Sequence, residues 1–238
     1  MLQTQDVNDN LGGTFTEIVA KILGIWIAAN VCYYQVLPLA GINLSYNTAP
    51  LVLSVYFLVW VVVSLVAFKD VYKKWLRAEY WMWLYVVQSI TAAIIIWCAL
   101  LVFPFLPGLH GPLLAPYSDL LFATPWYFLP KSIEILLQQV LIVTFILELS
   151  RRLQSFTKVL VWYALCFGGI HVVYYLVGSA PPAYAGMMSI GALMSTAVFP
   201  YLILRVRGGF VYAFMIHLLF YIFLALLLQT WPPPGYGV

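Results

Sequence analysis

Charged side chains are scarce in this chain, and the few that occur lie in groups. Only 8% of the 238 residues are charged, 64% are hydrophobic, and the mean hydropathy is +0.97. These values lie outside the usual range of soluble domains, so the composition predicts an integral membrane protein. The formal net charge of +3 arises from the groups between apolar stretches. It therefore indicates membrane topology, and we expect no nucleic-acid partner.

Cysteine is almost as rare as charge. Cys32, Cys98 and Cys166 are far apart and fall within apolar stretches, without the paired spacing typical of metal sites. We expect them to pack as small apolar side chains, and we expect no metal and no cofactor. Residues 1–16 are polar and slightly acidic, and the first apolar stretch is long enough to span a membrane. We therefore expect no cleavable signal peptide.

Long uncharged stretches dominate the rest of the chain. About 20 residues are needed to cross roughly 30 Å of hydrocarbon at ~1.5 Å per residue. The sequence therefore predicts an all-α, polytopic helical bundle with about seven transmembrane helices. These are expected near residues 18–39, 50–68, 81–105, 129–149, 159–178, 184–204 and 210–229.

Basic residues fall in alternate connections between these stretches. They lie in residues 69–79, 148–158 and 205–207, whereas the other connections have almost none. By the positive-inside rule, the N-terminus is expected in the cytoplasm and the C-terminus outside, most simply in a bacterial inner membrane.

A proline-rich stretch divides the chain. Five prolines between residues 107 and 130 argue against a continuous helix there. We expect a re-entrant or interfacial segment on the outer face. The chain then divides into residues 1–129, with N-terminal helices and this segment, and a helical core at 130–238.

A few polar side chains occur inside the predicted spans. Glu134 and Gln138 are four residues apart and share a helix face, with Gln139 next to them; His171 and His217 lie on the fifth and seventh spans. All are roughly 8–18 Å from the outer helix ends. One polar cluster in the outer half of the membrane is therefore predicted, and ionisable groups at such depth are costly unless they have a partner or a function.

Structural alternatives exist for these groups. Lys131, three residues before Glu134, could neutralise that carboxylate near the interface. A single histidine could also bond only to a backbone carbonyl, and a glutamine could act as an interhelical hydrogen-bond partner.

Two histidine motifs give the chain a family resemblance. Phe167 and His171 form an FxxxH pattern beside Gly168 and Gly169, and a second lone histidine, His217, follows in the last span. Over residues 130–229 the chain resembles the CPBP intramembrane proteases, which include type II CAAX prenyl endopeptidases and Abi proteins. Their motifs are EExxxR, FxxxH and HxxxN or HxxxD. The further similarities are Arg151-Arg152 after the first motif and the small residues Gly191 and Ser195 in the sixth span.

The resemblance implies a site in which a glutamate and the histidines activate water for peptide hydrolysis. This chain departs from that pattern. If the spacing back from Arg151-Arg152 is ungapped, Gln138-Gln139 stands in place of the paired glutamates and Val143 in place of the arginine. A shifted alignment lets Glu134 supply the first or second glutamate, but then Gln139 or Gln138 stands in place of the arginine. Tyr221 stands in place of the last asparagine. Glutamine cannot take a proton from water at neutral pH, although the Tyr221 phenol could donate to an oxyanion.

Three functions follow as hypotheses. The first is a non-proteolytic membrane scaffold or complex subunit that binds lipid or a transmembrane segment of another membrane protein, with Gly168, Gly169, Gly191 and Ser195 as helix-packing positions. The second is an active intramembrane endopeptidase with Glu134 as base and His171 and His217 as water or oxyanion ligands, supported by Gln138, Gln139, Phe167 and Tyr221. The third is a membrane subunit whose histidines ligate a haem or pigment, which the absorbance of purified protein would reveal.

Overall fold

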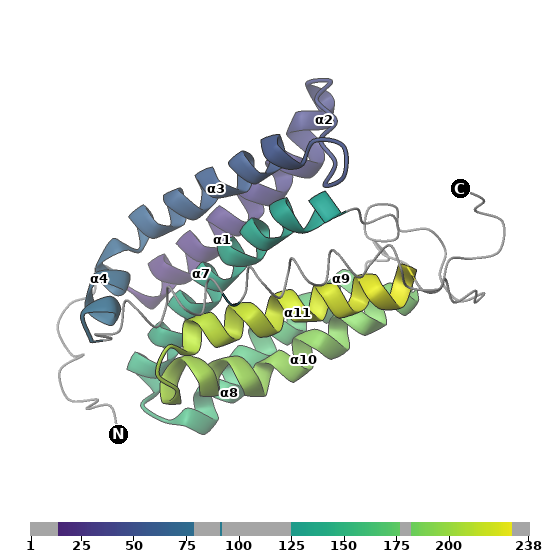
Figure 1. Ribbon diagram of the computed structural model, residues 1–238. Coiled ribbons are helices and arrows are strands. Elements are labelled where there is room, and N and C mark those ends of the chain that lie inside the picture. Colours follow the sequence, from purple (N-terminus) through teal and green to yellow (C-terminus); the bar gives the residue numbers. More distant parts are fainter. Residues whose placement is uncertain (1–13, 79–90, 92–124, 177–181, 230–238) are drawn as a thin grey trace.

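The computed structural model describes residues 14–78, 91, 125–176 and 182–229. Every regular element in these ranges is helical (Figure 1). In chain order they are α1 (Phe15–Val31), the π-helical η2 (Cys32–Val36), α2 (Leu37–Leu39), α3 (Pro50–Ala67), α4 (Lys69–Ala78), the 3₁₀ turn η4 (Pro125–Tyr127), α7 (Phe128–Leu153), α8 (Phe156–Tyr163), the π-helical η5 (Ala164–Gly168), α9 (Gly169–Leu176), α10 (Pro182–Arg205) and α11 (Gly209–Gln229).

Five helices in the described residues are long and apolar enough to cross a membrane. They are Phe15–Leu39, Pro50–Ala67, Phe128–Leu153, Phe156–Val173 and Gly186–Arg205. They confirm five of the predicted spans, and the chain is a polytopic membrane protein. α11 corresponds to the seventh predicted span, with a shorter described apolar part at Gly209–Ala225. The third predicted span and most of the proline-rich stretch lie outside the described residues.

Local chemistry explains where several helices begin and end. At the start of α1, the Thr14 backbone N–H donates to Glu17 Oε2 at 2.7 Å, and the Glu17 N–H donates back to Thr14 Oγ1 at 3.3 Å. This reciprocal cap satisfies two N–H groups that a helix start leaves open. α3 begins with Pro50, where a proline loses no helical hydrogen bond. α7 ends at Gln154, which has a φ of 49° in the left-handed region.

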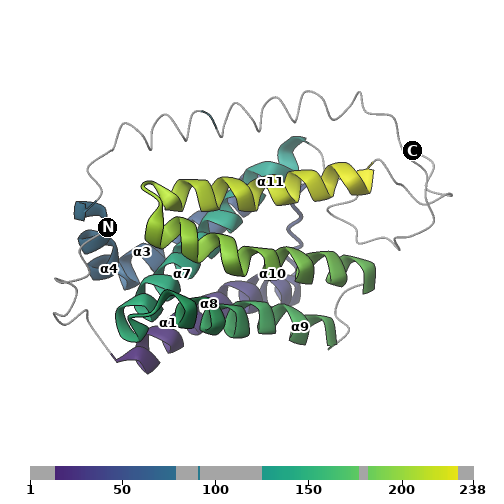
Figure 2. The same cartoon turned by 90° about the horizontal axis from the view of Figure 1, so that it is seen from below.

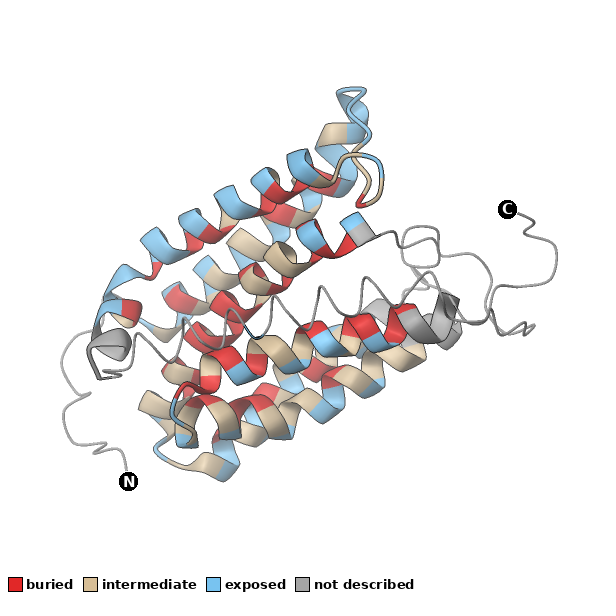
Figure 3. Cartoon of the chain, viewed as in Figure 1, coloured by how far each residue is buried: buried red, intermediate tan, exposed pale blue. Residues whose placement is uncertain are grey.

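α7 is the central helix of the bundle. In its most apolar stretch 61% of residues are buried, against 11–28% in the other four candidate spans. α3 and α1 pack on one side of it, and α8, α10 and α11 pack on the other (Figures 1 and 3). The remaining helices expose many leucine, valine and isoleucine side chains, as lipid-facing helices do. Since α1 and α3 contact α7, the described parts of residues 1–129 and 130–238 share one core.

The basic groups lie together at one end of the bundle. Figures 1 and 2 show α4, the α7–α8 turn and the α10–α11 turn at this end. Arg152 lies 5.4 Å from the ring centroid of Phe15, and Arg205 lies 5.4 Å from that of Phe156. We call this the basic end. The positive-inside rule predicts that it faces the cytoplasm.

Cysteine labelling would test this orientation. In a background without native cysteines, Thr157→Cys at the exposed start of α8 should react with a membrane-impermeant maleimide only after the membrane is permeabilised. Asn43→Cys, in the exposed connection before α3, should react in intact cells. The opposite labelling pattern would show that the predicted orientation is wrong.

Candidate functional site

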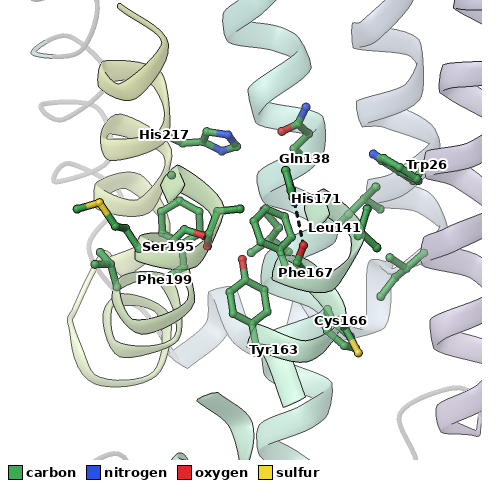
Figure 4. Close-up of a pocket in the computed structure, with 18 of the residues that line it drawn as sticks. Trp26, Gln138, Leu141, Tyr163, Cys166, Phe167, His171, Ser195, Phe199 and His217 are labelled. Atoms are coloured by element: carbon green, nitrogen blue, oxygen red, sulfur yellow. Dashed lines mark hydrogen bonds between the residues drawn. The ribbon is translucent and has the colours of Figure 1, made fainter. Parts of the chain in front are cut away.

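A cavity of about 630 Å³ lies within the bundle, and most of the polar residues predicted from sequence border it (Figure 4). Its walls come from α1, α7, α8, η5, α9, α10 and α11. Most lining side chains are apolar, and none of them is Asp, Glu, Lys or Arg. The lining residues with hydrogen-bonding capacity are Trp26, Gln138, Trp162, Tyr163, Cys166, His171, Ser195, His217 and Tyr221, with Met188 and Met194 as weak sulfur acceptors.

His171 follows a π-helical turn. The turn η5 (Ala164–Gly168) interrupts the helix just before α9, and such turns are frequent at functional sites. His171 Nδ1 lies 2.8 Å from the backbone oxygen of Phe167. The Phe167 ring lies 4.8 Å from the His171 ring and stacks on Tyr163 at 5.2 Å between centroids. The three rings therefore form a ladder along one wall of the cavity.

His217 enters the cavity from α11 and is held by α7. Its Nδ1 lies 3.0 Å from Gln139 Nε2, and the same amide nitrogen lies 3.5 Å from the Ala213 oxygen. Gln139 is fully buried, so this contact fixes the His217 ring against the central helix. The ring also lies 5.7 Å from Phe199 and 5.6 Å from Tyr221.

Glu134 belongs to a neighbouring hydrogen-bond network. Its Oε2 accepts from Lys131 Nζ and from the Tyr46 hydroxyl, both at 2.7 Å, and its Oε1 accepts from Gln138 Nε2 at 3.0 Å. Lys131 Nζ also lies 4.2 Å from the centroid of the Tyr221 ring. We call Lys131, Glu134, Tyr46 and Tyr221 the lysine cluster. It joins α7, α11 and the connection before α3.

The connection before α3 supplies a neutral donor to this cluster. Burial, and then the nearby Glu134 carboxylate, raise the pKa of Tyr46 well above its usual value. Tyr46 therefore keeps its proton and donates to Glu134 over any ordinary pH range. The loop is thereby fastened to the start of α7.

The predicted polar cluster is therefore found only in part. Gln138, His171, His217 and Tyr221 line one cavity. Gln139 does not line it, but its side-chain amide contacts His217 Nδ1. Glu134 does not line the cavity, and neither histidine is hydrogen-bonded to it in the described structure. The Lys131–Glu134 ion pair, raised as a structural alternative, is present at 2.7 Å. Gln138 connects the two networks, because it bonds to Glu134 and also lines the cavity.

The small residues predicted to pack helices together differ in how closely a neighbouring helix approaches them. A Cβ on Gly191 would lie 2.6 Å from Phe220 Cζ, so α10 and α11 approach closely there. A Cβ on Gly168 would meet Leu193 at an ordinary 3.4 Å. At Gly169 a Cβ would have no neighbour within 4 Å among the described residues, so this part of the chain provides no close helix contact there. Ser195 lines the cavity and donates to the Ala192 oxygen at 2.6 Å.

The sequence analysis did not identify two residues of the site, Tyr163 and Tyr46. Tyr163 precedes Phe167 by four residues and His171 by eight, so a helical ladder of rings is visible in the sequence. Tyr46 gives no such signal, because 88 residues separate it from Glu134 and only the tertiary fold brings them together.

The chemistry available at this site is hydrogen bonding within an apolar enclosure. Among the residues that the structure describes, no three His, Cys, Asp or Glu side chains are grouped as a metal ion would require. The cavity presents two imidazoles, an amide and hydroxyls to whatever occupies it. Comparison of the chain with protein-family models, with curated proteins and with solved structures gives no match, so the family resemblance stays a prediction.

Proposed function

We propose that this chain is a non-proteolytic membrane protein, a scaffold or complex subunit, whose intramembrane cavity holds a lipid chain. The cavity of about 630 Å³ with apolar walls and no lining carboxylate carries this proposal. Pockets of ~300–1,000 Å³ enclose one small organic ligand. The size and the apolar lining therefore suit a lipid chain.

The position of Glu134, the carboxylate next to the cavity in the described part of the chain, supports a role other than proteolysis. Peptide hydrolysis near neutral pH needs a base that can reach the attacking water. Both Glu134 oxygens already accept hydrogen bonds, and the residue lies outside the cavity wall. Gln139, which contacts His217, is an amide and cannot serve as the base. Glu134 is therefore better suited to balancing the charge of Lys131.

The cavity also reaches the lipid-facing surface. Two of its lining side chains, Leu23 on α1 and Trp162 on α8, are 39% and 50% exposed. An apolar chain can therefore pass sideways from the bilayer into the cavity without crossing a polar barrier.

Photolabelling would test this function. In nanodiscs, a hexadecane that carries a diazirine should cross-link to cavity residues such as Trp26 and Met188. Ser195→Phe, which places a large ring in the cavity, should reduce that labelling at least several-fold. Ile190→Phe is the matched control, because Ile190 lies on the same helix, is 59% exposed and does not line the cavity.

Labelling that is spread over lipid-facing positions and unchanged by Ser195→Phe would contradict a lipid-binding cavity. The same preparation should not cleave transmembrane peptide substrates. Cleavage that disappears with Glu134→Gln or His171→Ala would establish the endopeptidase hypothesis instead.

A further inference from the structure

The hydrogen bond made by His171 fixes which ring nitrogen carries its proton. A backbone oxygen only accepts, so the 2.8 Å contact with the Phe167 oxygen requires a proton on Nδ1. In the neutral ring, Nε2 then has a lone pair and is a hydrogen-bond acceptor. No described residue donates to this nitrogen.

His217 has the opposite arrangement. The Gln139 amide nitrogen faces both His217 Nδ1 and the Ala213 oxygen. Because the Ala213 oxygen can only accept, the group facing it must be the donating NH₂. His217 Nδ1 therefore accepts, and the neutral ring carries its proton on Nε2. That N–H is a donor, and it has no acceptor among the described residues.

We propose that the cavity binds a neutral, single-chain lipid with a hydroxyl head, and that this head donates to His171 Nε2 and accepts from His217 Nε2–H. This proposal rests on the lipid-binding function above and specifies its ligand. A hydroxyl has a proton and lone pairs, so it can satisfy one acceptor and one donor together. Both imidazoles line the same cavity.

The charge and depth of the site favour the same ligand. No charged side chain among the described residues lines the cavity, and the nearby Lys131 ammonium is already paired with Glu134, so a carboxylate or phosphate head would lack a free counter-ion. His217 lies eight residues from the start of α11, roughly 12 Å into the helix. At that depth the hydrocarbon offers a hydroxyl no hydrogen bond. The cavity therefore selects hydroxyl lipids over other apolar molecules.

A set of three ligands would test the head-group chemistry. Binding of hexadecan-1-ol, hexadecane and 1-methoxyhexadecane to the full-length protein in nanodiscs would be compared. Hexadecan-1-ol should bind most tightly. The ether can accept but not donate, so it should bind about fivefold to tenfold more weakly, as expected for one hydrogen bond lost. Hexadecane should bind more weakly still.

Variants would assign each hydrogen bond. In His171→Phe, the preference for the alcohol over the ether should disappear, because the acceptor is gone. His217→Phe should weaken binding of both oxygen-bearing ligands relative to hexadecane, because the donor is gone. Tyr212→Phe is the control, since Tyr212 is 39% exposed and does not line the cavity. It should leave all three affinities unchanged.

Nitrogen NMR would test the proton positions independently of affinity. The chain has three histidines, so ¹⁵N-histidine labelling with His110→Gln leaves two rings to observe. His171 should carry its proton on Nδ1 and His217 on Nε2, and hexadecan-1-ol should shift both Nε2 signals. Two rings with the same proton position, or equal binding of hexadecane and hexadecan-1-ol, would overturn this inference while leaving a lipid cavity intact. Failure of all three ligands to bind would overturn the proposed function as well.

Discussion

Replacing Gly209 with alanine should prevent the chain from accumulating as a folded protein. A Cβ at this position would collide with the Leu202 backbone oxygen and carbonyl carbon. The atoms in the way belong to the backbone of α10, so no change of side-chain rotamer can relieve the contact. Overpacking typically costs ~1–3 kcal/mol, and a backbone collision at the α10–α11 turn should reach or exceed that range.

The loss would be measured as folded protein after detergent extraction and as the melting temperature of whatever remains. Gly24→Ala is the matched control, because a Cβ there would have no neighbour within 4 Å. That change should be neutral or raise stability by up to about 1 kcal/mol, since alanine favours helix. Equal melting temperatures for Gly209→Ala and wild type would mean that α10 and α11 do not meet at this turn.

Much of the fold follows from hydropathy alone. Uncharged runs of about 20 residues have few alternatives to a spanning helix, because the bilayer leaves no water for unpaired backbone groups. The predicted 50–68 and 184–204 differ by only a residue or two from the observed Pro50–Ala67 and Gly186–Arg205. Grouping of the basic residues at one end follows from the same alternation of connections.

Tertiary detail was less accessible to sequence reasoning. The turn η5 has no clear signature, yet it precedes His171 and determines how α9 continues. Gly168, Gly169 and Gly191 were all predicted to allow close helix contact, and the tightest approach is at Gly191, where the bulky Phe220 meets α10. A glycine permits close packing, and the partner that actually packs there depends on helix rotation, which hydropathy does not fix.

For the site residues, the sequence predicted the depth along each helix better than the direction in which each side chain points. His171, His217 and Gln138 were placed at compatible depths and do share a cavity. Glu134 lies at a similar depth but bonds to Lys131 and Tyr46 instead. Residues four apart share a helix face only approximately, and long side chains can turn toward different neighbours. Hydrogen bonds from Lys131 and Tyr46 therefore determine the direction of the Glu134 carboxylate.

The Lys131–Glu134 pair should show strong energetic coupling. The two side chains are only 9% and 16% exposed, and Lys131 also lies against the Tyr221 ring. Removing one partner of a buried ion pair leaves an uncompensated charge and costs ~3–5 kcal/mol. Glu134→Met should therefore lower the free energy of unfolding by roughly 3 kcal/mol, at the low end of that range because both groups retain some exposure.

Lys131→Met alone should cost less than Glu134→Met, because Tyr46 and Gln138 still donate to the remaining carboxylate. The double variant, with no charge left to satisfy, should recover to within about 1–2 kcal/mol of wild type. Unfolding in detergent, followed by circular dichroism, would measure all three variants. Lys158→Met, at an exposed position on α8, should change stability by no more than about 0.5 kcal/mol. If Glu134→Met leaves stability unchanged but abolishes a measurable activity, the carboxylate serves chemistry rather than charge balance, and the non-proteolytic function proposed for this chain is wrong.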